Sequence, residues 1–194
     1  MENKISIKNE FLRKIIHLSN SGIAFMLLVW SQMTVIYFVI ILTIIILGVD
    51  LFRIYNNKVA LFYYKILGNV TRDFERKKLT GASYVMLASL ITLLLFDKYI
   101  CIASLLIMSY SDTSAALIGR VYGKTKIYEK TLEGSLAFFV TSLLIILCIV
   151  PKIDFLFALI AIIVATLVEL FSVFKIDDNL SVPIIAAVIM SLGG

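Results

Sequence analysis

The fold is decided by the stretch Tyr99-Ile-Cys-Ile-Ala-Ser-Leu-Leu-Ile-Met-Ser-Tyr-Ser-Asp112-Thr-Ser-Ala-Ala-Leu-Ile-Gly119. It is long enough to cross the hydrocarbon core of a bilayer, for which a helix needs roughly 17 to 25 residues. Its one carboxylate, Asp112, costs about 2.5 to 3.5 kcal/mol at membrane depth on insertion scales, so such residues usually face an interior or a water-filled cavity. The stretch therefore predicts a membrane helix with a polar site on its inner side.

Hydrophobic residues make up 61% of the 194-residue chain, against about 45–50% in a soluble domain. The apolar runs lack the alternation of an outer-membrane barrel, and only helices or a closed barrel satisfy the backbone in lipid. We therefore expect an all-α fold: a polytopic transmembrane helical bundle of about seven membrane helices, forming a single integral membrane domain over residues 1–194. The expected spans are roughly 15–31, 33–51, 82–97, 99–119, 134–150, 153–173 and 181–193.

The basic residues are divided unevenly between the loops. Of the 18 Lys and Arg residues, all but Lys98 and Lys152 lie in the N-terminal segment or in segments 52–81, 120–133 and 174–180. The positive-inside rule places these four segments in the cytoplasm, with the N-terminus inside and the C-terminus outside. Topology and attraction to anionic lipid headgroups account for most of the net charge of +5, so we expect no nucleic-acid partner.

A charged helix face precedes the first apolar run. Glu10, Arg13, Lys14 and His17 recur at positions i, i+3, i+4 and i+7 and so line one side of a helix. Lysine and arginine that extend to the membrane surface are one explanation, and an internal site is the other. The mixed signs of charge favour the internal site, and a multi-histidine metal site is excluded because His17 is the only histidine.

Two interpretations apply to Asp112. It is either a hydrogen-bonded structural residue in a packed bundle, where the small residues after it allow close helix approach, or a ligand of a hard cation. Mg²⁺ is usually held by one or two carboxylates together with substrate phosphates. The segment from Gly119 to Thr125 is not a P-loop, because that motif needs four residues between its glycines and a preceding strand.

Two further polar segments flank the later spans. In Lys130-Thr131-Leu-Glu133-Gly134-Ser135, Thr131 or Glu133 can cap the next helix, while Lys130 and the helix N-terminus can bind phosphate oxygens. Both roles can hold together.

The second segment follows Glu169, which lies within an apolar run. Asn179 or Ser181 before Pro183 is typical of a helix start. Capping does not require the two adjacent carboxylates of Asp177 and Asp178, so a second metal or nucleotide contact is a plausible prediction.

In order along the chain, these segments resemble the CTP-dependent lipid kinase family, which includes dolichol kinase, phytol kinase and a fungal diacylglycerol kinase. That family is related to the CTP:phosphatidate cytidylyltransferases. The matching residues are Glu10-x-x-Arg13-Lys14-x-x-His17, Thr80-Gly81-Ala82-Ser83-Tyr84, Ser111-Asp112-x-Ser114-Ala115-Ala116-x-x-Gly119, Gly123, Lys130-Thr131-x-Glu133-Gly134-Ser135, Glu169 and Asp177-Asp178-Asn179-x-x-x-Pro183.

The resemblance implies transfer of the γ-phosphate of CTP, with Mg²⁺, to the hydroxyl of a membrane lipid alcohol: a polyprenol or dolichol, phytol or diacylglycerol. Phosphoryl transfer needs mainly positioning and charge neutralisation, which suits acids and bases without a covalent nucleophile. The short chain is similar to compact bacterial members of the family, so we expect a bacterial cytoplasmic membrane.

The expected catalytic residues are Asp112, Lys130 and one of two acids, Glu133 or Glu169, that orients or deprotonates the lipid hydroxyl. The metal is assigned to Asp112, with Asp177 and Asp178 as candidate second ligands. The nucleotide is assigned to Lys130, Lys124, Arg120, Gly119, Gly123 and Gly134, with Arg13, Lys14 and His17 closing the pocket from the first helix.

Two rival functions remain open from the sequence. A phosphatidate cytidylyltransferase would also use CTP, but its signature contains a His-Gly-Gly segment and an Asp-Arg-x-Asp element, whereas this chain has no histidine after His17. A small ion-coupled transporter could use Asp112 as its ion site. Transporters of that kind often contain inverted repeats, and no convincing internal repeat is present here.

Overall fold

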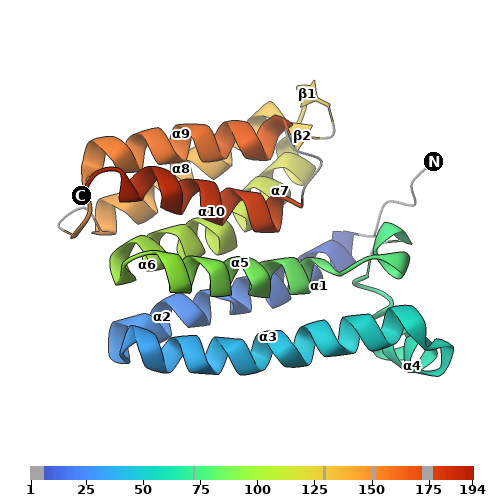
Figure 1. Cartoon of the computed structure of the whole chain (residues 1–194). Coiled ribbons are helices and arrows are strands. Elements are labelled where there is room, and N and C mark those ends of the chain that lie inside the picture. Colours follow the sequence, from blue (N-terminus) through green and yellow to red (C-terminus); the bar gives the residue numbers. More distant parts are fainter. Residues whose placement is uncertain (1–6, 72, 129, 150–151, 172–176) are drawn as a thin grey trace.

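Helices make up almost all of the described part of the chain (Figure 1). The computed structural model describes residues 7–71, 73–128, 130–149, 152–171 and 177–194. The elements in order are α1 (Ile7–Ser19), α2 (Ser21–Val29), α3 (Gln32–Tyr55), α4 (Asn57–Leu67), the short 3₁₀ helix η1 (Asp73–Lys77), α5 (Gly81–Leu95), α6 (Lys98–Leu106), η2 (Ile107–Ser111), α7 (Asp112–Tyr122), β1 (Lys126–Ile127), β2 (Lys130–Thr131), α8 (Leu132–Ile149), α9 (Phe155–Phe171) and α10 (Asp178–Ser191).

Four helical segments are long and apolar enough to cross a membrane. They are Phe11–Val29, Gln32–Tyr55, Lys98–Tyr122 and Leu132–Ile149, and three shorter apolar helices, α5, α9 and α10, run beside them. The expectation of an all-α membrane protein is therefore confirmed. Within the described residues, each expected apolar run is mainly helical, although the first contains a break at Asn20 between α1 and α2.

The helices are arranged in layers (Figure 1). Helices α8, α9 and α10 lie on one side, α5 and α6 in the middle, and α2 and α3 on the other side. The amphipathic helix α4, the hairpin β1–β2 and the start of α1 gather at one end, whereas the C-terminus lies at the opposite end. The loops rich in basic residues thus share one end of the bundle.

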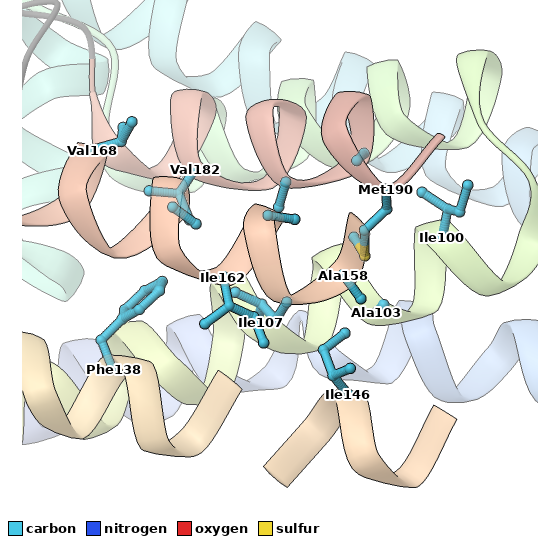
Figure 2. Close-up of a cluster of buried hydrophobic side chains, with 14 of the residues drawn as sticks. Ile100, Ala103, Ile107, Phe138, Ile146, Ala158, Ile162, Val168, Val182 and Met190 are labelled. Atoms are coloured by element: carbon cyan, nitrogen blue, oxygen red, sulfur yellow. The ribbon is translucent and has the colours of Figure 1, made fainter. Parts of the chain in front are cut away.

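Two clusters of buried apolar side chains fill the interior. One joins α6, α8, α9 and α10 around Phe138, Ile162 and Met190 (Figure 2). The other joins α2, α3, α5 and α6 around Leu27, Val39 and Leu105. In the first, buried alanines of α9 and α10 allow these helices to approach closely.

The helical segment Lys98–Tyr122, which contains the span expected at 99–119, includes a wider turn. Residues Ile107–Ser111 form the π-helical segment η2, and Asp112 is the first residue after it. The Ser142 hydroxyl donates a hydrogen bond of 2.8 Å to the Ser111 hydroxyl, which connects this turn to α8. Such turns occur frequently at functional sites.

The start of α10 differs from the expected one. The helix begins at Asp178, and its cap is Asp177, whose carboxylate accepts a hydrogen bond from the Asn179 N–H. Neither Asn179 nor Ser181 is the cap. Pro183 therefore lies in the second turn rather than at the start, and the acid before the helix satisfies an N–H group there.

Helices α7 and α8 cross at two glycines. A Cβ atom on Gly134 would lie 2.8 Å from the Ala115 carbonyl oxygen and 3.2 Å from the Cα atom of Gly119. Thr131 fills the remaining space and caps α8, because its hydroxyl accepts a hydrogen bond of 3.2 Å from the Gly134 N–H. The expected cap of this helix at Thr131 is confirmed, and the small residues after Asp112 do provide close helix approach.

We predict that Gly134→Ala lowers stability by about 1–3 kcal/mol, because the added methyl group meets backbone that must move. The matched control is Gly48→Ala in α3, where a Cβ atom would meet nothing within 4 Å and the substitution is neutral or slightly stabilising. Thermal unfolding of the detergent-purified variants measures the difference. Equal Tm values for the two variants would contradict the close crossing.

Candidate functional site

The first ion pair of the site joins α1 to α7. The Lys14 ammonium group donates a hydrogen bond to Asp112 Oδ2, and it lies 3.4 Å from the Asp112 carbonyl oxygen. Lys14 is only 3% exposed. A lysine so deeply buried does not extend to the membrane surface, so Lys14 turns inwards from the charged face of α1 and neutralises the acid at the start of α7.

The second ionic group joins the hairpin to α9 and α10. Lys130 Nζ donates to Glu169 Oε1 at 2.7 Å and to Asp178 Oδ2 at 2.9 Å. Ser135 donates to the other Glu169 oxygen at 3.1 Å. Burial favours the neutral amine, but attraction by Asp178, Glu169 and Asp112 outweighs it, so the pKa of Lys130 lies above its ordinary value. The lysine is therefore charged at neutral pH.

A chain of hydrogen bonds connects the start of α10 to α1. The Asn179 amide donates from Nδ2 to Asp177 Oδ1 at 2.6 Å. That bond turns the Asn179 Oδ1 atom towards His17, whose Nε2 lies 2.6 Å away. Because the amide oxygen only accepts, Nε2 carries the proton. The same nitrogen lies 3.8 Å from Asp112 Oδ2.

These groups meet around one small cavity. It is lined by Asp112, Glu169 and Asp178 with Asn179, and by Met108, Phe138 and Val182. Its volume is about 10 Å³, about enough for a single water molecule. Residues from α1, α7, α9, α10 and the hairpin thus converge on three carboxylates balanced by two lysines.

The donor set suits a hard divalent cation only with outside oxygens. In the described part of the chain, no group of three or more His, Cys, Asp or Glu side chains is arranged to hold a metal ion. Mg²⁺ is usually held by one or two carboxylates plus phosphate oxygens, and Asp112 and Asp178 lining one cavity match that requirement. Asp177, the other expected second ligand, directs Oδ1 to the N–H and side-chain amide of Asn179.

Other expected site residues lie elsewhere. Glu133 accepts hydrogen bonds of 3.1 and 3.3 Å from the Thr125 N–H and so holds the segment before the hairpin. Arg120 and Lys124 are exposed. Gly119 and Gly123 pack against Thr131, and Gly134 packs against Gly119. Of the charged face of α1, the side chain of Glu10 lies outside the described residues.

A buried network that the sequence analysis missed lies at the end of α3. Asp50 accepts hydrogen bonds from Arg53 at 3.0 and 3.1 Å, and from the Thr80 and Ser83 hydroxyls at 2.8 and 2.6 Å. Arg53 donates to the carbonyl oxygens of Glu75 and Lys78 at 3.0 and 2.8 Å. The available signal was an acid and an arginine three residues apart in an apolar run, followed by the Thr80-Gly81-x-Ser83 match.

Comparison with known proteins yields several relatives. No family model matches the chain, and no solved structure matches it. An uncharacterized protein of Rickettsia prowazekii is 33% identical over 180 residues, covering 89% of this chain and 88% of that protein. CTP-dependent diacylglycerol kinase 1 of Schizosaccharomyces pombe is 30% identical over 149 residues, covering 67% of each chain. The Saccharomyces cerevisiae protein of the same name is 27% identical over 221 residues, covering 95% of this chain and 73% of its own.

We predict that Lys14→Met destabilises the protein by about 3 kcal/mol, because it leaves the charge of Asp112 without its partner. The double variant Lys14→Met/Asp112→Asn should recover most of this loss, since a neutral amide needs no counter-charge. Denaturant unfolding in detergent measures both, with Lys58→Met on exposed α4 as the control. If Lys14→Met behaves like Lys58→Met, the pair does not stabilise the bundle.

Proposed function

Because this chain belongs to the family of CTP-dependent lipid kinases, we propose that it transfers the γ-phosphate of CTP to the hydroxyl group of a membrane lipid alcohol. One observation carries the proposal: Asp112, Glu169 and Asp178 line one cavity and are balanced by Lys14 and Lys130. Phosphoryl transfer is catalysed mainly by positioning and charge neutralisation. Carboxylates and lysines brought together in a buried place are suited to both.

In this proposal, Asp112 and Asp178 hold the Mg²⁺ of the nucleotide, and Asp177 supports Asp178 by capping α10. The metal would neutralise phosphate charge when bound. Lys130 and Lys14 bind phosphate oxygens. To do so, each lysine gives up a contact with a carboxylate and contacts the nucleotide instead. The small cavity cannot hold a triphosphate without that exchange, since it has room for about one water. Arg120 near the end of α7 and Lys124 just after it, both exposed, complete the phosphate contacts, while Gly119, Gly123 and Gly134 allow α7 to pack closely against Thr131 and α8.

The reaction forms a bond between the lipid oxygen and the γ-phosphorus while the bond from that phosphorus to the β–γ bridging oxygen breaks. The products are the lipid phosphate and CDP, and the hydroxyl proton passes to a carboxylate. Glu169 is better placed for that proton than Glu133, because Glu169 lines the cavity whereas Glu133 holds the backbone of Thr125. His17 and Arg13 close the site from α1.

We propose that all seven apolar helical segments cross the membrane, with the N-terminus and the basic loops in the cytoplasm and the C-terminus outside, as in a bacterial cytoplasmic membrane. At 1.5 Å per residue, the 17 residues of α9 cover about 25 Å, and modest local thinning of the bilayer accommodates such a span. Of the basic residues behind this orientation, Lys4, Arg72 and Lys175 lie outside the described residues, as does the side chain of Lys8.

Among lipid alcohols, diacylglycerol is the first to test, because relatives from two yeasts are named as diacylglycerol kinases. Phytol and polyprenols also present a hydroxyl above a long apolar tail. The decisive assay supplies γ-labelled CTP with each alcohol and follows label into lipid and the release of CDP. Incorporation of label from the cytidine instead would indicate a cytidylyltransferase. If CTP neither labels a lipid nor raises the Tm, the kinase proposal fails and an ion-coupled transporter becomes the better explanation.

We predict that Asp112→Asn lowers kcat by at least about 100-fold, in the range of other electrostatic groups at transition states. The control is Asp97→Asn, an exposed acid just before α6, which should keep normal turnover. Both variants should insert and purify. Labelled lipid phosphate is measured at saturating CTP and Mg²⁺. Near-normal turnover of Asp112→Asn would remove Asp112 from the metal site.

A further inference from the structure

A second, much larger cavity lies between α1, α2, α3, α4 and α5. Its volume is about 490 Å³, within the range of roughly 300–1,000 Å³ typical of small-molecule sites. It does not share the three carboxylates of the small cavity. Its lining changes character along the helices, from polar at Arg13, His17 and Thr80 to apolar at Met26 and Leu42.

The order of these residues along four helices indicates the direction of the change. In α1 and α2 the lining runs from Arg13 to Met26, and in α5 it begins near Thr80 and ends at Met86. In α3, which runs the other way, the apolar lining extends from Ile46 to Phe38. The polar end therefore faces the end of the bundle with the basic loops, and the apolar end extends into the membrane-spanning part.

The cavity reaches the surface among apolar side chains. Ile16 and Phe38 both line it and are 49% and 42% exposed. They belong to the segments Phe11–Val29 and Gln32–Tyr55, both of which are long and apolar enough to span a membrane. An opening bordered in this way faces lipid rather than water, so its natural occupant enters from the bilayer.

Two buried polar atoms, on side chains that line this cavity, have no hydrogen-bond partner among the described residues. They are His17 Nδ1 and Asn20 Nδ2, on side chains that are 8% and 7% exposed. Since His17 Nε2 donates to Asn179, Nδ1 is an acceptor, whereas Asn20 Nδ2 is a donor. Buried polar groups are normally paired, and a single ligand group that both donates and accepts could pair with this acceptor and this donor.

We propose that the large cavity is the acceptor-lipid site, with the lipid hydroxyl between His17 Nδ1 and Asn20 Nδ2. Its tail runs past Met26 and Leu42. A hydroxyl both donates and accepts and so pairs with both atoms, whereas an ionised phosphate only accepts. This inference rests on the proposed kinase function. His17 connects the two sites, because its other nitrogen lies 3.8 Å from Asp112. The bound hydroxyl is thus one imidazole ring away from the carboxylate of Asp112.

Photolabelling tests the location without any turnover. The whole protein in detergent–phospholipid micelles is irradiated with a diacylglycerol that carries a diazirine in its acyl chain, and labelled peptides are identified by mass spectrometry. We expect labelling of α2 and α3 that competes with unlabelled diacylglycerol but not with its hydroxyl-methylated ether. Leu42→Trp should strongly reduce that labelling, because the larger side chain obstructs the apolar end of the cavity. The control Ile41→Trp, on the exposed side of the same helix, should leave it intact.

Kinetics test the role of the polar pair. Asn20→Leu removes the donor at nearly constant volume and should raise the KM for the lipid about tenfold, the equivalent of one hydrogen bond. The KM for CTP should stay within about twofold. Equal rises in both KM values would indicate a general structural effect and overturn the assignment.

The outcomes separate the two proposals. Competable labelling without phosphate transfer would leave the lipid site standing and overturn the kinase function. Phosphate transfer with labelling spread evenly over lipid-facing helices, unchanged by Leu42→Trp, would overturn the site and leave the kinase function standing.

Discussion

Charge neutralisation inside an apolar bundle is the constraint on which this structure depends. A buried carboxylate or ammonium group without a partner costs several kcal/mol, so the charges of the candidate site are held against opposite ones from distant parts of the chain. Lys14 on α1 meets Asp112 on α7, and Lys130 on β2 meets Glu169 on α9 and Asp178 on α10. The same pairs therefore fix helix positions and assemble the site.

The Asp50–Arg53 network has a related but separate role. It ties the end of α3 to η1 and to the start of α5, and the Arg53 guanidinium also stacks over Tyr63 of α4 at 5.0 Å. Glu75 extends this arrangement, since its carboxylate accepts a hydrogen bond of 3.1 Å from the Gly81 N–H. Thr80, Gly81 and Glu75 all line the large cavity. The network thus builds the polar end of that cavity from segments that have little apolar surface to bury.

Residue patterns predicted the helical fold because length and hydropathy decide it directly. They also predicted that the charged face of α1 turns inwards, because a helix face that carries both signs of charge indicates an internal site rather than contact with lipid. The spacing of residues along the sequence could not show which of Glu133 and Glu169 lies at the small cavity. That depends on the direction in which the hairpin points Lys130. Nor could the spacing reveal the Asp50 network, which depends on contacts across 30 residues. The role of Asn179 was likewise hidden, because it depends on how Asp177 orients the amide.

The π-helical segment η2 limits how the number of residues before Asp112 can change. An α-helix turns about 100° per residue, and a π-helical turn contains more residues than a regular α-helical turn. The direction in which Asp112 points is therefore set by the number of residues in Ile107–Ser111. Deleting or inserting a single residue there would rotate the whole of α7 about its axis. The rotation would move Asp112 away from Lys14 and the glycines away from α8. A change in the number of residues at this turn would accordingly disturb the site more than a substitution there would.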